Sequence, residues 1–242
     1  MIKLNICAGP NVFPCDGWIN YDRDGNTVYF NHLNTVANEM TAYAGNFHPG
    51  LQQALSQMPE HQLRVVNYIK SGGKINNQIH DIRNPFTQHP DGTIDCIYVG
   101  QAIEHFNPIY ETPPFLKECY RMLKPGGVLR MTTPDFELII NTYMNGQMDK
   151  FSPEQPDFYK NALPEEQLSY LMFGACGPSC SWSNYEGHMF LFTKDSMTKA
   201  LLAAGFSNPV FYQETGQSLH PVMQKEVVDA GMSHSFIVEV AK

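Results

Sequence analysis

The chain opens with Lys3-Leu-Asn-Ile-Cys-Ala-Gly-Pro10, a short apolar run that stops at a glycine and a proline. Such a run, bounded by a turn dipeptide, predicts a buried strand over residues 3–8 that leads into a tight turn. The next run, Trp18-Ile-Asn-Tyr21, alternates and ends in the acidic segment Asp22-Arg-Asp-Gly25. It predicts a second strand that delivers acidic side chains to its own carboxyl end.

Strands and helices alternate along the rest of the chain. We expect further strands at residues 74–82, 94–99, 128–132, 209–213 and 235–240, and helices at 49–57, before Lys70, at 113–123 and at 193–204. Turns are expected at Asp91-Gly92 and at Lys124-Pro-Gly-Gly127. This order predicts an α/β fold with a doubly wound, mostly parallel sheet, which binds ligands outside the carboxyl ends of its strands.

The helix at 193–204 has defined end signals. Thr193 is expected to cap its start and Gly205 its end. The expected buried face consists of Met197, Leu201, Leu202 and Ala204.

Length and composition favour one domain. The 242 residues are 43% hydrophobic, which is ample for a single large core. Apolar periodicity is lost in two segments, so we expect one domain over residues 1–242 with insertions at about 26–70 and 145–187. Nothing in the sequence indicates an oligomeric state.

Charge, hydropathy and cysteine spacing restrict the partners. A net charge of −8 argues against binding to duplex nucleic acid. No membrane span and no signal peptide are visible, and the six cysteines form no disulfide framework, so we expect a cytoplasmic protein. Cys176, Cys180 and His188 have no clear fourth partner, so no metal site is expected.

Six short motifs occur in a recognisable order: Leu4-Asn-Ile-Cys-Ala-Gly-Pro10, Gly17-Trp-Ile-Asn-Tyr-Asp22, Asp81-Ile82, Ala102-Ile-Glu-His105, Leu123-Lys-Pro-Gly-Gly127 and Thr133-Pro-Asp135. Together they resemble class I S-adenosylmethionine-dependent methyltransferases, most closely the bacterial and viral branch of the type 11 enzymes. The resemblance covers residues 3–135 and resumes at His188. It implies a Rossmann-like seven-stranded sheet with an antiparallel last strand, methyltransferase activity, and S-adenosyl-L-methionine as cofactor.

The resemblance also implies which residues would hold the cofactor. Those expected at the binding loops are Cys7, Ala8, Gly9, Pro10, Asp22, Arg23, Asp81, Ile82, Gly100 and Gln101. Gly9 would allow the backbone to approach the methionine part, and Asp22 would accept hydrogen bonds from the ribose hydroxyls. Asp81 and the N–H of Ile82 would pair with the adenine.

Glu104 and His105 are the candidate catalytic pair, as an acid and an imidazole beside the methyl donor. His188 is a further candidate base. Methyl transfer from a sulfonium is an in-line displacement that depends mainly on positioning, so a base is needed only for some acceptors. Glu104 and His105 could equally have no catalytic role and cap the following loop.

The acceptor is expected to be a small molecule with a hydroxyl or amine group, such as a sugar or another metabolite. Aromatic residues in the second insertion would either line its pocket or anchor the loop to the core: Tyr143, Phe158, Tyr159, Tyr170, Trp182 and Tyr185.

The first loop departs from the family's Gly-x-Gly, because Cys7 stands at the first glycine. A methyltransferase-like subunit that binds a protein partner without turnover is therefore the alternative function. A nicotinamide dehydrogenase is disfavoured because residues 7–22 lack G-x-G-x-x-G.

Overall fold

The computed structural model describes residues 1–7, 13–14, 17–22, 33, 35–40, 53, 55–58, 60–154, 161–173, 187–227, 229 and 232–242. The strands are β1 (Lys3–Ile6), β2 (Trp18–Asp22), β3 (Asn77–Ile79), β4 (Ile94–Gly100), β5 (Leu123–Pro134), β6 (Ser207–Tyr212) and β7 (Ser235–Ala241). The α-helices with defined bounds are α3 (Glu60–Lys70), α4 (Thr112–Met122), α5 (Phe136–Met144), α7 (Pro164–Phe173), α8 (Lys194–Ala203) and α9 (Pro221–Glu226). Short 3-10 helices are η1 (Ile103–His105), η2 (Met148–Glu154) and η3 (Met232–His234).

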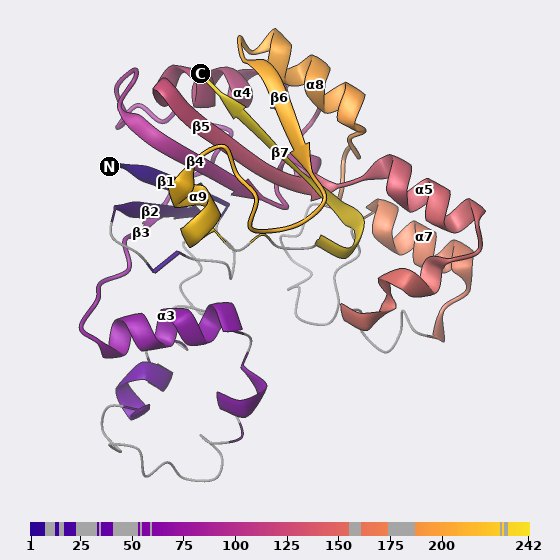
Figure 1. Cartoon of the computed structure of the whole chain (residues 1–242), viewed down its shortest axis with the longest axis horizontal. Helices are drawn as coiled ribbons and strands as arrows, with labels where there is room; N and C mark the ends of the chain where they lie inside the picture. Colours follow the sequence, from indigo (N-terminus) through magenta and orange to yellow (C-terminus); the bar gives the residue numbers. More distant parts are fainter. Residues whose placement is uncertain are drawn as a thin grey trace.

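The seven strands form one sheet in the order β3-β2-β1-β4-β5-β7-β6 (Figure 1). Strands β1 to β5 pair in parallel, whereas β7 runs antiparallel to both β5 and β6. The predicted seven-stranded, mostly parallel sheet with an antiparallel last strand is confirmed. No helix in the described part of the chain has the length and apolar character needed to cross a bilayer.

Alternating side chains of β4 supply the cores on the two faces of the sheet. Ile97 and Val99 belong to the main cluster, which includes Leu116 of α4 and Leu201 of α8. Cys96 and Tyr98 lie in the opposite cluster with Met223 of α9. Because both faces are covered, β1 is buried at every position, and β4 at every position except Asp95 and Gly100.

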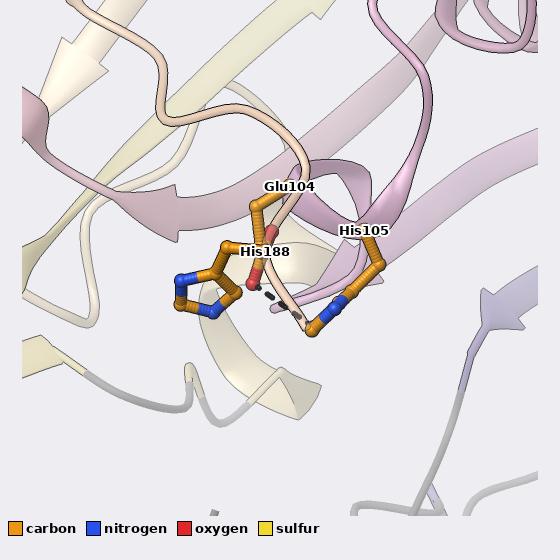
Figure 2. Close-up of side chains that lie close together, drawn as sticks. All are labelled: Glu104, His105 and His188. Atoms are coloured by element: carbon orange, nitrogen blue, oxygen red, sulfur yellow. Dashed lines mark ion pairs between the residues drawn. The ribbon is translucent and has the colours of Figure 1, made fainter. Parts of the chain in front are cut away.

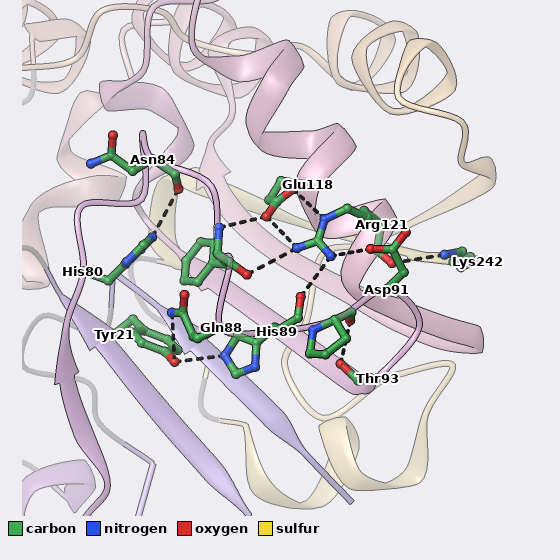
Figure 3. A network of polar contacts seen from close by, with 12 residues as sticks. Tyr21, His80, Asn84, Gln88, His89, Asp91, Thr93, Glu118, Arg121 and Lys242 are labelled. Carbon is green, nitrogen blue, oxygen red and sulfur yellow. Dashed lines mark hydrogen bonds and ion pairs between the residues drawn. The ribbon is translucent and has the colours of Figure 1, made fainter.

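The connection from β3 to β4 is fastened to α4 by one guanidinium group (Figure 3). Arg121 donates to the carbonyl oxygens of His89 at 2.9 Å and Phe86 at 3.3 Å. It also pairs with Asp91 at 2.6 Å and with Glu118 at 2.7 Å. This network fixes the loop that follows Asp81 and Ile82, and so fixes one side of the carboxyl edge.

Several predicted elements have different bounds. The strand expected at 74–82 is only Asn77–Ile79, because it pairs with β2 alone at the edge of the sheet. The strand expected at 128–132 extends over Leu123–Pro134 and includes the predicted turn, where the pairing with β4 shifts register. The helices α5, α7 and α9 were not predicted. Asp135, expected only to end a strand, caps α5 by accepting a hydrogen bond from the Leu138 N–H at 3.1 Å.

The helix expected at 193–204 forms as α8, and Thr193 caps it in a capping box with Ser196. Met197, Leu201 and Ala204 are buried as expected, but Leu202 is 52% exposed. The C-cap is Ala204, and Gly205 follows it with a φ of +105°, the left-handed conformation that glycine adopts readily.

Both predicted insertions contain helices with small cores of their own. In the first, Val65 and Val66 of α3 pack with Leu33 and Met40, and Figure 1 shows α3 beneath the sheet. In the second, Met148, Phe151 and Leu171 pack with Ile139 of α5, the helix that precedes the insertion. The expected helix at 49–57 is helical at residues 53 and 55–57, and its remainder lies outside the described residues.

A buried ionic group links β5, β7 and the segment before η3. The Arg130 guanidinium lies 2.6 Å from Asp229 and 2.6 Å from Glu239, and all three side chains are at most 2% exposed. Arg130→Ala would leave two buried carboxylates without their cation, so we expect the free energy of unfolding to fall by about 3–5 kcal/mol. Urea denaturation followed by circular dichroism measures this loss.

Lys124→Ala is the matched control, because Lys124 is 42% exposed and pairs with Asp95 at 2.8 Å. It should cost less than about 1 kcal/mol. An equally small loss for Arg130→Ala would contradict the structural role assigned to the buried group.

Candidate functional site

The carboxyl ends of the central strands meet in one row. In the sheet register Ile6 of β1 lies opposite Tyr21 of β2 and Val99 of β4. The next residues along these strands are Cys7, Asp22 and Gly100, so the three strands end side by side. Open α/β sheets bind their ligands at the carboxyl ends of their strands.

Two residues at this edge have left-handed backbone conformations that side chains disfavour. Cys7 has a φ of +56° and Gln101 a φ of +50°. The Gln101 N–H donates to the Thr132 carbonyl oxygen at 2.9 Å, and its side-chain amide donates to the Ser235 hydroxyl at 2.9 Å. Gln101 is thereby held against β5 and β7, and β4 ends in a sharp turn.

Packing against Tyr98 explains why residue 100 is a glycine. A Cβ at this position would lie 2.7 Å from the Tyr98 hydroxyl and 2.8 Å from its ring. Tyr98 is fully buried, so the space that a larger residue would need is filled from within the same strand.

The two acidic residues at the outer strands have different surroundings. Asp22 ends β2, is partly exposed, and accepts the His80 N–H on its main-chain oxygen at 2.9 Å. Asp81 is held by Arg83, whose guanidinium nitrogens lie 3.0 and 3.2 Å from the two carboxylate oxygens. Any adenine contact by Asp81 must therefore share or displace Arg83, while Ile82 is buried beside it.

Glu104 is the most unusual group of the site. It is fully buried in η1, directly after the end of β4, and its Oε2 accepts the Thr133 hydroxyl at 3.1 Å. Its Oε1 has no hydrogen-bond partner among the residues that the structure describes. Burial raises the pKa of the Glu104 carboxyl to about 8, because water no longer stabilises the charged form.

Two imidazoles accompany this carboxyl group (Figure 2). His105 Nε2 lies 3.9 Å from Glu104 Oε1, and the His105 and His188 rings are 5.0 Å apart between centroids. Burial, and to a smaller extent the nearby His105, lower the pKa of His188 to about 4. His188 is therefore neutral at neutral pH, with a lone pair on one ring nitrogen.

Main-chain hydrogen bonds bring His188 to Glu104 from far along the sequence. The N–H groups of Met189 and Phe190 both donate to the Glu104 carbonyl oxygen, at 2.8 and 3.1 Å. The His188 N–H donates to the Phe173 carbonyl oxygen of α7 at 3.1 Å. The segment after residue 187 thus closes over η1 and ties it to the second insertion.

The expected site residues are only partly within the described structure. Cys7, Asp22, Gly100 and Gln101 lie at the strand ends, and Glu104, His105 and His188 form the cluster beyond them. Ala8, Gly9, Pro10 and Arg23 lie outside the described residues, as do Phe158, Tyr159, Cys176, Cys180, Trp182 and Tyr185. Thr133, which holds Glu104, was not singled out, because its partner is distant in sequence.

Two of the aromatic residues assigned to the second insertion lie within the described structure, and their contacts indicate that they anchor the loop to the core. Tyr143 and Tyr170 pack against the apolar cluster of Ile139, Met148 and Leu171. For these two, the loop-anchoring interpretation fits better than a role in lining an acceptor pocket.

Cys7 stands where the family has glycine, yet it keeps the left-handed backbone at φ +56°. Replacement by glycine relieves roughly 1–2 kcal/mol of backbone strain and loses roughly 0.5–1 kcal/mol through the greater freedom of the unfolded chain. We expect Cys7→Gly to be more stable than Cys7→Ala by about 0.5–1 kcal/mol. Cys7→Ala is the matched control because it also removes the thiol, and urea denaturation compares the two; a less stable glycine variant would contradict the strain.

Comparison with known proteins gives a partial sequence match. Residues 43–131 match the family model described as a methyltransferase domain. A protein of Mycolicibacterium smegmatis, named a probable S-adenosylmethionine-dependent methyltransferase, is 39% identical over 46 residues, which is 19% of this chain. That match spans only 17% of the relative's own length.

Solved structures of S-adenosylmethionine-dependent methyltransferases also align with the chain. A protein from Archaeoglobus fulgidus is 12% identical, with a TM-score of 0.44, over 99% of this chain and 85% of that one. A protein from Methanosarcina mazei is 15% identical, with a TM-score of 0.46, over 99% and 91% of the two chains.

The matched segment includes the site residues from Asp81 to His105, whereas residues 7–10 and 22–23 lie before it. The strand order and the antiparallel β7 are those that the sequence resemblance implied. The chain therefore contains a segment, residues 43–131, that is similar to the methyltransferase domain.

Proposed function

We propose that the chain transfers a methyl group from S-adenosylmethionine to a hydroxyl or amine group of a small-molecule acceptor. The observation that best supports this function is that the ends of β1, β2 and β4 form a single row. The buried Glu104, with His105 and His188, lies directly beyond that row. Binding and reaction would then occupy neighbouring parts of one edge.

The residues at this edge suit the parts of the cofactor. Asp22 would accept the two ribose hydroxyls, a pair of hydrogen bonds to a charged group. Gln101 would lie beside the methionine part, where its left-handed backbone turns the chain at the end of β4. The buried Thr132 hydroxyl oxygen, which has no partner within the described residues, is a further polar atom on the strand next to β4.

The bound cofactor supplies a methyl group on a positively charged sulfur, which an acceptor oxygen or nitrogen displaces in line. The protein's part is mainly positioning, because alignment of the two reacting atoms supplies much of the rate. Glu104, His105 and His188 converge within one small region, so they suit the binding of the acceptor's reacting group. His105 is more accessible than Glu104: its side chain is 22% exposed, against 1% for Glu104.

A methyltransferase-like subunit without turnover stays the second candidate. It is favoured by Cys7, which has a side chain and a strained backbone where the family's first loop has glycine. The two functions differ in whether the edge binds the cofactor.

Calorimetry with S-adenosylmethionine and with S-adenosylhomocysteine tests cofactor binding. We expect micromolar binding by the unaltered protein, and Asp22→Ala should weaken it at least about tenfold because a charged hydrogen-bond acceptor worth about 1.5–3 kcal/mol is lost. Asp91→Ala is the control, since its side chain is 81% exposed and lies in the loop bound by Arg121.

Binding that Asp22→Ala leaves unchanged would place the cofactor elsewhere. No binding by the unaltered protein would favour the subunit without turnover, and Cys7→Gly then shows whether the first loop is responsible.

Incubation with methyl-labelled cofactor and pools of small hydroxyl and amine compounds tests the acceptor class. We expect label to move to at least one pool, and His105→Ala to reduce that transfer while cofactor affinity stays the same, because His105 lies beyond the cofactor row. Transfer only to a protein or nucleic acid would contradict a small-molecule acceptor.

A further inference from the structure

Three groups of the site have the composition of a metal centre. Glu104, His105 and His188 each present one ligand atom, and these atoms all lie within 4.8 Å of one another. Figure 2 shows the Glu104 carboxyl group between the two imidazole rings. We propose that Glu104, His105 and His188 bind one divalent transition-metal ion, and that this ion holds the reacting oxygen of a hydroxyl acceptor. The second part rests on the proposed methyltransferase function.

The Glu104 carboxyl group is the first argument. It is completely buried, and its Oε1 lacks a hydrogen-bond partner in the described part of the chain. Buried polar atoms in folded proteins nearly always have a hydrogen-bond partner. A buried polar atom that lacks one therefore needs an explanation, such as a bound ion. The other oxygen is already held by Thr133 at 3.1 Å, which orients the carboxyl group as outer partners orient metal ligands.

The orientation of His188 is the second argument. Its Nδ1 lies 3.0 Å from the Leu171 carbonyl oxygen, and a carbonyl can only accept, so Nδ1 carries the hydrogen. The lone pair is therefore on Nε2. Histidine ligands of metals typically donate their second ring N–H to a carbonyl or carboxylate in this way, which fixes both tautomer and ring orientation.

The ligand set is the third argument. Two imidazoles and one carboxylate form the set found in catalytic zinc sites and in non-haem iron sites, and both kinds keep positions open for a substrate. With bonds of about 2.0–2.2 Å, two ligands of one ion lie at most about 4.4 Å apart. The present 4.8 Å requires only a small inward movement, which His105 can make because its side chain is 22% exposed.

An ion at this place would have a defined task. It would bind the acceptor's hydroxyl oxygen, lower the pKa of that hydroxyl group, and hold the oxygen in line with the methyl group. The hydroxyl proton would pass to water or to a neighbouring base, and the oxygen–carbon bond would form as the sulfur–carbon bond breaks. Sequence spacing gave no such signal, because His188 is far from Glu104 and His105 along the chain.

The test is direct metal binding by the whole chain after treatment with a chelator. Titration with Zn²⁺, Mn²⁺ and Mg²⁺ in separate calorimetric runs should give one site for Zn²⁺ or Mn²⁺ and weaker binding of Mg²⁺, which prefers oxygen ligands. Glu104→Gln and His188→Ala should each weaken binding at least about 100-fold, since even outer partners of ligands contribute 10–100-fold. Circular dichroism and thermal unfolding establish that each variant is folded.

His220→Asn is the matched control, because His220 caps α9 on the other face of the sheet and asparagine is a good capping residue. It should bind metal as the unaltered protein does. Co²⁺ in place of Zn²⁺ should give visible bands without a sulfur charge-transfer band, since the proposed ligands are nitrogen and oxygen.

The proposal is overturned if the folded protein binds none of the three ions, if Glu104→Gln and His188→Ala bind as tightly as His220→Asn, or if Co²⁺ shows sulfur ligation. Cofactor binding is measured separately on the same preparations. Metal binding without cofactor binding keeps the ion site and overturns its role toward the acceptor, whereas cofactor binding without metal overturns the ion site alone.

Discussion

The parallel register of β1 between β2 and β4 is the constraint on which the rest of the molecule depends. It brings Cys7, Asp22 and Gly100 to one line from three separate stretches of sequence. The register is fixed because β1 is buried on both faces, so a slip by one residue would turn every side chain to the opposite cluster. Cys7, Asp22 and Gly100 therefore lie together because of where their strands stand in the sheet.

The second part of the site depends on a connection that closes late in the chain. Residues 187–192 return to the sheet, and two of their N–H groups bind the Glu104 carbonyl oxygen. That contact buries Glu104 and sets His188 beside it. The row of strand ends and the Glu104 cluster are thus built by different physical means: the first by strand pairing, the second by main-chain hydrogen bonds from the segment that follows the second insertion.

The sheet could be predicted from sequence because each strand has its own local signal. Apolar runs with glycine and proline at their ends located all seven strands, and Thr193 marked the start of α8. The errors arose where context overrides pattern: β3 is short because only β2 pairs with it, and Leu202 is exposed although it fits the apolar spacing. Residues at the strand ends, and Glu104, His105 and His188, could be singled out from sequence. The contacts that hold this second group could not, because Thr133 with Glu104 and Leu171 with His188 join distant segments and leave no local pattern.

In the proposed function the cofactor lies across the ends of β1, β2 and β4 with its sulfur facing Glu104, His105 and His188. A crystal structure of the complex with S-adenosylhomocysteine tests this placement. We expect both ribose hydroxyls within hydrogen-bond distance of the Asp22 carboxylate and the sulfur on the side of the Glu104 cluster. A ligand bound away from this row, or with its sulfur turned from the cluster, would contradict the placement.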